Sequence, residues 1–304
     1  MQKNLAIVFP GQGSQKVGML TQFAEKYSLV AENFARASQV LGYDLWEIVV
    51  QGPAEKLNQT IYTQPAMLVA DVTMWQIWQE QNNDRPVLMA GHSLGEYAAL
   101  VAASAIDFSD AVSLVSKRAH FMQDAVLPGD GVMVVILGLT AREVVKVCGE
   151  VSGEQVVQAV NFNSPQQVVI AGHTQACERA MSAAKEAGAK IVKKLPVSVP
   201  AHSLLMKPAA EQFAEYLQNI EIQSPKISVI NNVDVKINHD PEEIRSALVR
   251  QLYNPVRWVE TIEFMVKQGV DTIIECGPGK VLMGLNKRIN TNVKHLSCRD
   301  VSFT

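Results

Sequence analysis

The sequence is poor in cysteine and lacks a cluster of metal-ligating residues. Its four cysteines, at positions 148, 177, 276 and 298, form no C-x-x-C pair and have no group of histidines beside them. Zinc sites and disulfide frameworks both depend on such spacings. We therefore expect reduced cysteines that serve in packing, and neither a metal ion nor another bound cofactor.

An excess of positive charge is also missing. The chain has 27 Lys and Arg residues against 30 Asp and Glu residues, which gives a net charge of −3. Proteins that bind nucleic acids use Lys and Arg side chains to neutralise the phosphate backbone. The charge balance therefore argues against a nucleic acid partner.

Long apolar runs are absent as well. The most apolar stretches, residues 5–9 and 132–137, are much shorter than the ~20 residues that a membrane-spanning helix needs. Residues 1–4 lead directly into the first stretch, with no extended apolar region and no small-residue cleavage site of a secretory signal. We expect a cytoplasmic protein that does not span a membrane.

The sequence does contain enough apolar residues for a large core. Of its 304 residues, 48% are hydrophobic and 19% are charged, which excludes a disordered chain. Short apolar segments at 5–9 and 86–90 are typical of strands buried in a parallel sheet, and helical periodicity at 30–41 and 65–79 separates them. This alternation predicts an α/β fold, which continues with helices near 204–217 and 241–253 and strands near 227–230 and 272–275.

Residues 128–197 follow a different order of elements. Strands are expected at 132–139, 156–162, 167–171 and 190–195, one helix after the capping box at Thr140 and another at 174–187. The order β-α-β-β-α-β is that of a ferredoxin-like unit. We therefore predict a discontinuous main domain, residues 1–127 and 198–304, which carries a small ferredoxin-like domain at 128–197.

The most informative motif is Gly91-His-Ser-Leu-Gly95, which fits G-x-S-x-G between a predicted buried strand and an Ala-rich helix. A serine on such a sharp turn needs glycine on both sides, because side chains there would collide with the neighbouring strand and helix. The turn exposes the hydroxyl of Ser93 as a nucleophile. It also leaves the N–H of Leu94 at a helix N-terminus, where it can bind an oxyanion.

A serine hydroxyl needs a base that takes its proton. Of the six histidines we favour His202, which follows a strand and Pro200 at the edge of the predicted sheet. His92 adjoins Ser93, but consecutive side chains of the turn point apart, and His120 is expected on a helix. His173, His239 and His295 are expected in polar loops or in the C-terminal tail. No acidic residue between Ser93 and His202 stands out as a third member, which leaves a backbone carbonyl as a candidate for the group that orients the histidine.

One arginine lies on an apolar helix face. Arg118 shares a stripe with Ala111, Leu114, Val115, Ala119 and Met122. Because a guanidinium stays charged and is costly to bury alone, an anion should meet it. Two interpretations are open: an internal salt bridge, and a fork that binds the carboxylate of a substrate through two hydrogen bonds.

The Gly-rich loop Gly11-Gln-Gly-Ser-Gln-Lys16 follows the first predicted strand, as a nucleotide-binding loop would. It carries Lys16 where a dinucleotide fingerprint has its third glycine, and neither this loop nor Gly277-Pro-Gly-Lys280 is a Walker A sequence. We expect instead that small residues let the backbone approach the active site, with the N–H of Gln12 as a second oxyanion donor.

Several long motifs together resemble one family, the malonyl-CoA:acyl carrier protein transacylases of bacterial fatty acid synthesis. The resemblance extends over nearly the whole chain, and its motifs occur in the family's order: Phe9-Pro-Gly-Gln-Gly-Ser-Gln15, Gly91-His-Ser-Leu-Gly-Glu-Tyr97, Asn161-Phe-Asn-Ser-Pro165, Pro200-Ala-His-Ser203, Asn231-Asn-Val233, Arg250-Gln-Leu-Tyr-Asn-Pro255 and Gly277-Pro-Gly-Lys280. Ala201, beside the candidate base, is a position at which family members differ in size.

The resemblance implies an α/β-hydrolase-like core with a ferredoxin-like insertion. It also implies Ser93 as nucleophile, His202 as base, and Arg118 as the residue that binds the malonyl carboxylate. The N–H groups of Gln12 and Leu94 would form the oxyanion hole. The backbone carbonyl of Gln251 would orient the histidine.

The implied reaction transfers a malonyl group from malonyl-CoA to the phosphopantetheine thiol of acyl carrier protein through a malonyl-serine ester. The phosphopantetheine belongs to the partner protein, so the enzyme itself needs no cofactor. Two alternatives come from other classes. A serine esterase or patatin-like acyl hydrolase would share the elbow, but it would usually have a catalytic Asp and would not need Arg118. A silent scaffold that only binds acyl carrier protein would be expected to have lost Ser93 or His202, and both are present.

Overall fold

The computed structural model describes residues 4–197 and 199–300. Within them, parallel strands form a sheet of order β7-β2-β1-β8-β9. Its strands are β1 (Leu5–Phe9), β2 (Leu88–Gly91), β7 (Ser228–Ile230), β8 (Thr272–Glu275) and β9 (Lys294–Ser297).

Helices cover both faces of this sheet because the residues of its central strand alternate between two cores. Leu5, Ile7 and Phe9 belong to one apolar cluster, whereas Ala6 and Val8 belong to another. The second cluster is completed by α12 (Trp258–Lys267) and α13 (Val281–Ile289). The first is completed by α1 (Thr21–Ala24), α2 (Ser28–Leu41), α3 (Leu45–Gln51), α4 (Ala54–Leu57), α5 (Thr60–Gln81), α6 (Gly95–Ala102), α7 (Phe108–Asp124), the 3-10 turn at Leu204–Met206, α10 (Lys207–Leu217) and α11 (Pro241–Gln251).

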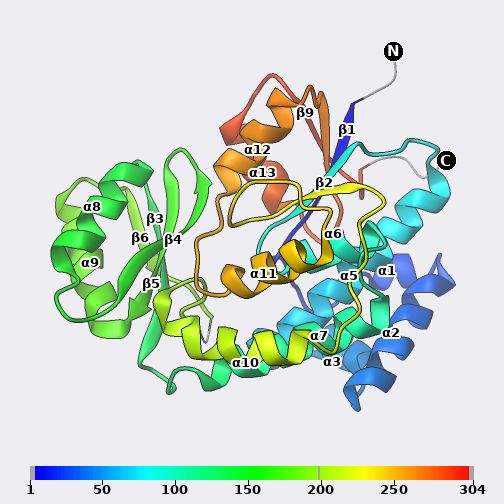
Figure 1. Ribbon diagram of the computed structural model, residues 1–304, viewed down its shortest axis with the longest axis horizontal. Coiled ribbons are helices and arrows are strands. Elements are labelled where there is room, and N and C mark those ends of the chain that lie inside the picture. Colours follow the sequence, from blue (N-terminus) through cyan, green and yellow to red (C-terminus); the bar gives the residue numbers. More distant parts are fainter. Residues whose placement is uncertain (1–3, 198, 301–304) are drawn as a thin grey trace.

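A second, antiparallel sheet has the order β4-β5-β3-β6. It consists of β3 (Gly131–Leu137), β4 (Val157–Ser164), β5 (Gln167–His173) and β6 (Ile191–Lys194). Helices α8 (Ala141–Val151) and α9 (Thr174–Glu186) pack on its outer face, on the left of Figure 1. The capping box that opens α8 is present, with the side chains of Thr140 and Glu143 bonded to each other's backbone N–H. The other face presents Met133, Val160, Val169 and Ala171. These residues pack against Ala201, which follows the second sheet in the sequence.

These sheets confirm the predicted α/β class and the ferredoxin-like order of the second unit. The domain boundaries at 127/128 and 197/198 stay a prediction, and residue 198 lies outside the described residues. Two expectations were wrong. His173 is not in a polar loop but is the last residue of β5, where it pairs with Gly131 of β3. His295 is not in a polar loop or tail but on β9, where it is 8% exposed. The polar residues around it in the sequence hide this strand, which pairs with β8 at the edge of the sheet.

The turn from β2 to α6 is possible only because two glycines flank it. A Cβ at Gly95 would lie 2.1 Å from the backbone oxygen of Phe9 on β1, and a Cβ at Gly91 would lie 1.8 Å from the backbone carbon of Gly95. Both obstacles are backbone atoms, which cannot rotate away. A side chain at either position would therefore collide with backbone, as expected from the motif. The close approach that the glycines allow places the turn of Ser93 beside the end of β1.

Gly95→Ala should lower the free energy of unfolding by about 3 kcal/mol, since β1 and α6 would have to separate. Gly284→Ala is the matched control, because Gly284 lies on the exposed side of α13 with open space around it. That change should raise the free energy of unfolding by ~0.5–1 kcal/mol through helix propensity. Denaturant titrations of both variants test this. Equal effects would show that the close approach does not limit the fold.

Candidate active site

A cavity of about 130 Å³ lies where the second sheet faces the elbow. The main part of the chain contributes its polar wall, and the second unit contributes a largely apolar wall. The polar wall includes Gln12, Gln64, His92, Ser93, Leu94, Arg118 and His202, and the opposite wall includes Met133, Asn161, Asn163, Val169 and Leu195. Five of the site residues proposed from the sequence, Gln12, Ser93, Leu94, Arg118 and His202, therefore meet at one cavity. The sixth, Gln251, does not line the cavity but contacts His202 and Arg118 behind it.

Ser93 lies on the elbow with a strained backbone. Its φ of 52° is in the left-handed region, which a residue with a side chain seldom adopts. The strain is held by Asn232, whose side-chain oxygen accepts the N–H of Ser93 at 2.7 Å and whose side-chain nitrogen donates to the carbonyl of Gly91 at 2.6 Å. The serine hydroxyl consequently points into the cavity.

His202 faces this hydroxyl from the loop after the second unit. The distance from Ser93 Oγ to His202 Nε2 is 2.7 Å. On the other side of the ring, Nδ1 lies 2.8 Å from the backbone carbonyl of Gln251, the last residue of α11. Because a carbonyl only accepts, Nδ1 carries the proton and Nε2 presents its lone pair to the serine. The geometry is that of a serine and a base oriented by a backbone carbonyl.

The environment keeps this imidazole neutral. His202 is buried, and burial lowers its pKa to about 3, with a further lowering by the nearby charge of Arg118. Both effects disfavour the imidazolium form. A neutral ring is the form that can accept a proton from Ser93.

Arg118 is 2% exposed and reaches the same hydroxyl. Its Nη1 donates to Gln64 Oε1 at 2.7 Å, and its Nη2 donates to Gln251 Oε1 at 3.0 Å and lies 3.5 Å from Ser93 Oγ. Its Nε is buried without an acceptor, and the guanidinium carbon lies 5.3 Å from the ring centre of Tyr97. Among the residues that the structure describes, no carboxylate bonds to Arg118, so the internal salt bridge is not formed. Two neutral carboxamides hold a cation that has room for an anion.

Two backbone N–H groups at the cavity have the features of an oxyanion hole. Gln12 and Leu94 both line the cavity. Within the described part of the chain, neither of their N–H groups donates to a backbone or side-chain acceptor. The loop of Gln12 comes close because Gly11 has no side chain, and a Cβ there would lie 2.4 Å from the carbonyl of His92. The roles assigned to Gln12 and Leu94 stay predictions.

His92 is turned away from the serine. Its Nε2 bonds to Asn163 Oδ1 on β4 at 2.8 Å, and burial lowers its pKa. The ring therefore links the elbow to the second unit. The consecutive side chains of His92 and Ser93 point apart, as expected from the motif: His92 bonds to Asn163 and Ser93 bonds to His202.

Sequence reasoning did not single out Gln64, Glu96 or Asn232. Glu96 and Asn232 lie in motifs that carried the family resemblance, but a Glu on a helix and an Asn in a loop are ordinary surface residues by pattern. Glu96 is in fact 2% exposed and Asn232 is fully buried. Only the tertiary contacts identify them: Gln64 of α5 bonds to Arg118, Glu96 of α6 bonds to Gln251, and Asn232 of the loop after β7 bonds to the N–H of Ser93.

In residues 4–197 and 199–300, no group of three or more His, Cys, Asp or Glu side chains is arranged to hold a metal ion. None of the helices described there is both long enough and apolar enough to cross a membrane. The expectation of an enzyme without a cofactor stays a prediction.

His202→Ala should reduce the rate of acylation of Ser93 by an acyl thioester by roughly 10²-fold or more, because the base is lost. Since the pKa of His202 is about 3, the base remains neutral as the pH falls from 7 to 5. Acetyl-CoA donates an acyl group without a charge. The rate of single-turnover acylation of the wild-type enzyme by acetyl-CoA should therefore not decline with a midpoint near pH 6.5. An unchanged rate in this variant, together with severe loss in His92→Ala, would assign the base to His92.

Comparisons with known proteins show the family of the chain. The chain is 58% identical over 284 residues to the malonyl CoA-acyl carrier protein transacylase of Salmonella typhimurium, covering 93% of this chain and 92% of the relative. The crystal structure of an acyl carrier protein S-malonyltransferase from Vibrio cholerae has a TM-score of 0.94 at 54% identity, covering 97% of this chain and 96% of that one. A structure of a type II polyketide synthase acyl carrier protein in complex with its malonyl-transacylase matches with a TM-score of 0.95 at 55% identity, over 97% and 96% of the two chains. The acyl transferase domain model matches residues 6–297, and the chain belongs to this acyl transferase family.

Proposed function

We propose that this protein transfers the malonyl group of malonyl-CoA to the phosphopantetheine thiol of acyl carrier protein and so supplies fatty acid biosynthesis. The observation that carries the proposal is the position of Arg118, a buried cation to which no described carboxylate bonds directly, 3.5 Å from the hydroxyl of Ser93. A substrate that carries a carboxylate close to its reactive carbonyl, as a malonyl thioester does, can place the carbonyl at Ser93 and the carboxylate at Arg118. The names of the relatives point to the same substrate.

In the first half of the reaction, Nε2 of His202 takes the proton of Ser93 as the hydroxyl attacks the malonyl thioester. The N–H groups of Gln12 and Leu94 would stabilise the oxyanion. The thioester bond breaks, and CoA leaves as a thiol with the proton from His202. A malonyl ester remains on Ser93.

In the second half, the thiol of the phosphopantetheine arm gives its proton to His202 and attacks the ester. The ester bond breaks, Ser93 recovers its proton, and the malonyl group leaves on the carrier. Because a thioester is exchanged for a thioester, the main requirement is that water does not reach the ester. The small cavity, with Met133, Val169 and Leu195 on the wall opposite the elbow, suits this requirement.

The alternative of a serine esterase or patatin-like acyl hydrolase is less consistent with the site. Such an enzyme would usually orient its histidine with a carboxylate, whereas Nδ1 of His202 bonds to the carbonyl of Gln251. It would also have no use for a buried arginine beside the nucleophile. An acyl carrier protein as partner and a cytoplasmic location remain part of this proposal.

Malonyl-CoA should leave a covalent malonyl ester on Ser93. Intact-mass measurement after brief incubation should show an increase by one malonyl group, and Ser93→Ala should abolish it because the nucleophile is gone. Ser104→Ala is a suitable control, since Ser104 does not line the cavity. An adduct on any residue other than Ser93 would contradict the mechanism.

Arg118 should distinguish malonyl from uncharged acyl groups. Arg118→Ala should reduce kcat/KM for malonyl-CoA by an amount equivalent to about 2–3 kcal/mol, the range of hydrogen bonds to charged groups. Acetyl-CoA has no carboxylate, so its transfer should fall little or even improve. Arg118→Lys should rescue only partly, because an ammonium lacks the two-pronged geometry.

The measurement is kcat/KM for both thioesters in the wild type and the two Arg118 variants. Equal losses for the malonyl and acetyl groups would mean that Arg118 has a structural role and does not select the substrate.

A further inference from the structure

Glu96 is a buried carboxylate that no step of the proposed mechanism uses. It lies on α6, three residues after Ser93, and it is 2% exposed. Its Oε2 accepts the backbone N–H of Asn232 at 3.0 Å and the side-chain Nε2 of Gln251 at 2.8 Å. A carboxylate placed here costs desolvation energy unless a cation compensates it.

The carboxamide of Gln251 connects this carboxylate to Arg118. Its nitrogen donates to Glu96 and, at 3.2 Å, to the carbonyl of Ser93, while its oxygen accepts Nη2 of Arg118 at 3.0 Å. Only this orientation of the Gln251 carboxamide satisfies both neighbours, because the carboxylate of Glu96 needs a donor and the guanidinium of Arg118 needs an acceptor. One amide therefore joins a buried negative charge to a buried positive charge.

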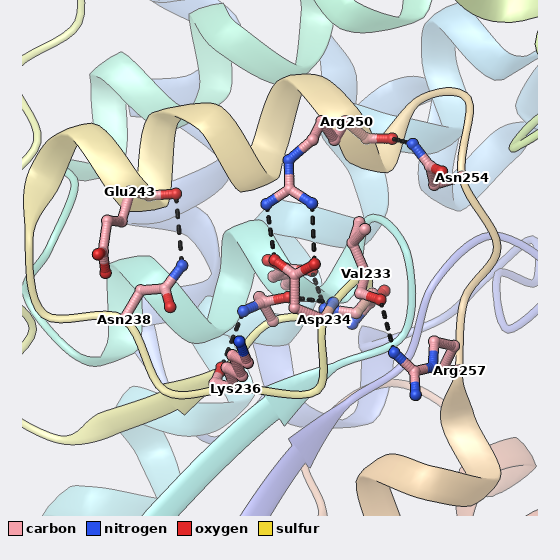
Figure 2. A network of polar contacts seen from close by, with 11 residues as sticks. Val233, Asp234, Lys236, Asn238, Glu243, Arg250, Asn254 and Arg257 are labelled. Atoms are coloured by element: carbon pink, nitrogen blue, oxygen red, sulfur yellow. Dashed lines mark hydrogen bonds and ion pairs between the residues drawn. The ribbon is translucent and has the colours of Figure 1, made fainter.

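The other charged groups around Glu96 are already paired or uncharged. Asp234 accepts two hydrogen bonds from Arg250, at 2.9 and 2.6 Å, in the network that holds the loop of Asn232 against α11 (Figure 2). Tyr97 is buried, and burial raises the pKa of its hydroxyl, so it stays neutral. His202 is neutral as well, because its pKa is lowered to about 3. Arg118 is thus the cation that compensates Glu96 from the side of the cavity.

A malonyl group on Ser93 would bring a second carboxylate to Arg118. Two buried carboxylates then compete for one guanidinium, and a proton on one of them relieves the repulsion. We propose that Glu96 is the counter-charge of Arg118 in the unloaded enzyme and that it takes up a proton when the malonyl carboxylate binds. This inference rests on the proposed function, because it needs an acyl group with a carboxylate.

The environment of Glu96 favours such an exchange. Burial raises its pKa to about 7, against the lowering effects of its bonds to Gln251 and Asn232 and of the charge of Arg118. An additional negative charge beside Arg118 shifts the pKa further upward. The carboxyl is therefore ready to be protonated near neutral pH, where the enzyme would be at work.

The loading step balances with one extra proton. Malonyl-CoA, the Ser93 hydroxyl, the Glu96 carboxylate and one proton from solvent give malonyl-Ser93, the thiol of CoA and a neutral Glu96 carboxyl. The hydroxyl proton of Ser93 passes through His202 to the CoA sulfur, as before. The proton on Glu96 comes from the solution, so the loading equilibrium becomes dependent on pH.

The experiment measures the ratio of loaded to free enzyme by intact mass at pH 6, 7 and 8, at a fixed ratio of malonyl-CoA to CoA. Loading from acetyl-CoA in the presence of CoA is measured in parallel. Ionisation of the CoA thiol changes both loading equilibria equally with pH, so it drops out of the ratio of malonyl to acetyl loading. Between pH 6 and 8 the malonyl ratio should fall about fivefold or more relative to the acetyl ratio. The same pH dependence for both acyl groups in the wild type would overturn the inference without any variant.

Glu96→Gln supplies a second test, because it resembles the protonated carboxyl in shape and charge. In this variant the ratio of malonyl to acetyl loading should be constant within about twofold over the same range. Glu211→Gln, on the exposed surface of α10, is the matched control and should keep the wild-type dependence. A retained pH dependence in Glu96→Gln would assign the proton to another group. Absence of any malonyl adduct in the wild type would instead refute the proposed function, and the inference with it.

Discussion

The burial of one permanent cation beside the hydroxyl of Ser93 is the constraint on which the site depends. Arg118 cannot lose its charge, so its surroundings must stabilise it before a substrate arrives. Gln64 and Gln251 accept its hydrogen bonds without neutralising it. Glu96 lies on the far side of Gln251, whose carboxamide bonds to both Glu96 and Arg118. This arrangement keeps the cation available. Under the proposed function, a carboxylate of the protein bonded directly to Arg118 would occupy the place of the malonyl carboxylate.

The same residues also hold the serine and the histidine. Gln251 uses its backbone carbonyl for His202 and its side chain for Arg118, and Asn232 fixes the strained turn of Ser93. Charge compensation and alignment of the nucleophile are therefore parts of one hydrogen-bond network. The pair of Asp234 and Arg250 holds the two segments of that network together from outside (Figure 2).

The second unit completes the cavity without contributing the reactive groups. Its inner sheet face supplies Met133 and Val169, and β4 supplies Asn163 to hold His92. Ala201, next to His202, packs against the inner face of the second sheet, so His202 lies close to where the two units meet. An acyl group in the cavity would be enclosed by both units.

Local sequence determined much of this protein. The apolar run of β1, the capping box of α8 and the glycines around Ser93 follow from short-range sterics and hydrogen bonding, which act within a few residues. The stripe on α7 likewise placed Arg118 inside. The strand of His295 was missed, since an edge strand with polar neighbours has no periodicity of its own.

Tertiary structure decided which distant groups meet. Ser93 and His202 are 109 residues apart, and Gln251 is 158 residues from Ser93, so residue patterns could suggest the nucleophile and favour a base but could not measure their contact. The assignment of Gln251 needed a family resemblance, because a backbone carbonyl is the same at every residue and leaves no trace in the sequence. Glu96 shows the limit most clearly. Its charge is ordinary on an exposed helix. Only the packing of α6 against α5 and α7, together with the hydrogen bonds from Gln251 and Asn232, removes water from Glu96 and connects it to Arg118 through Gln251.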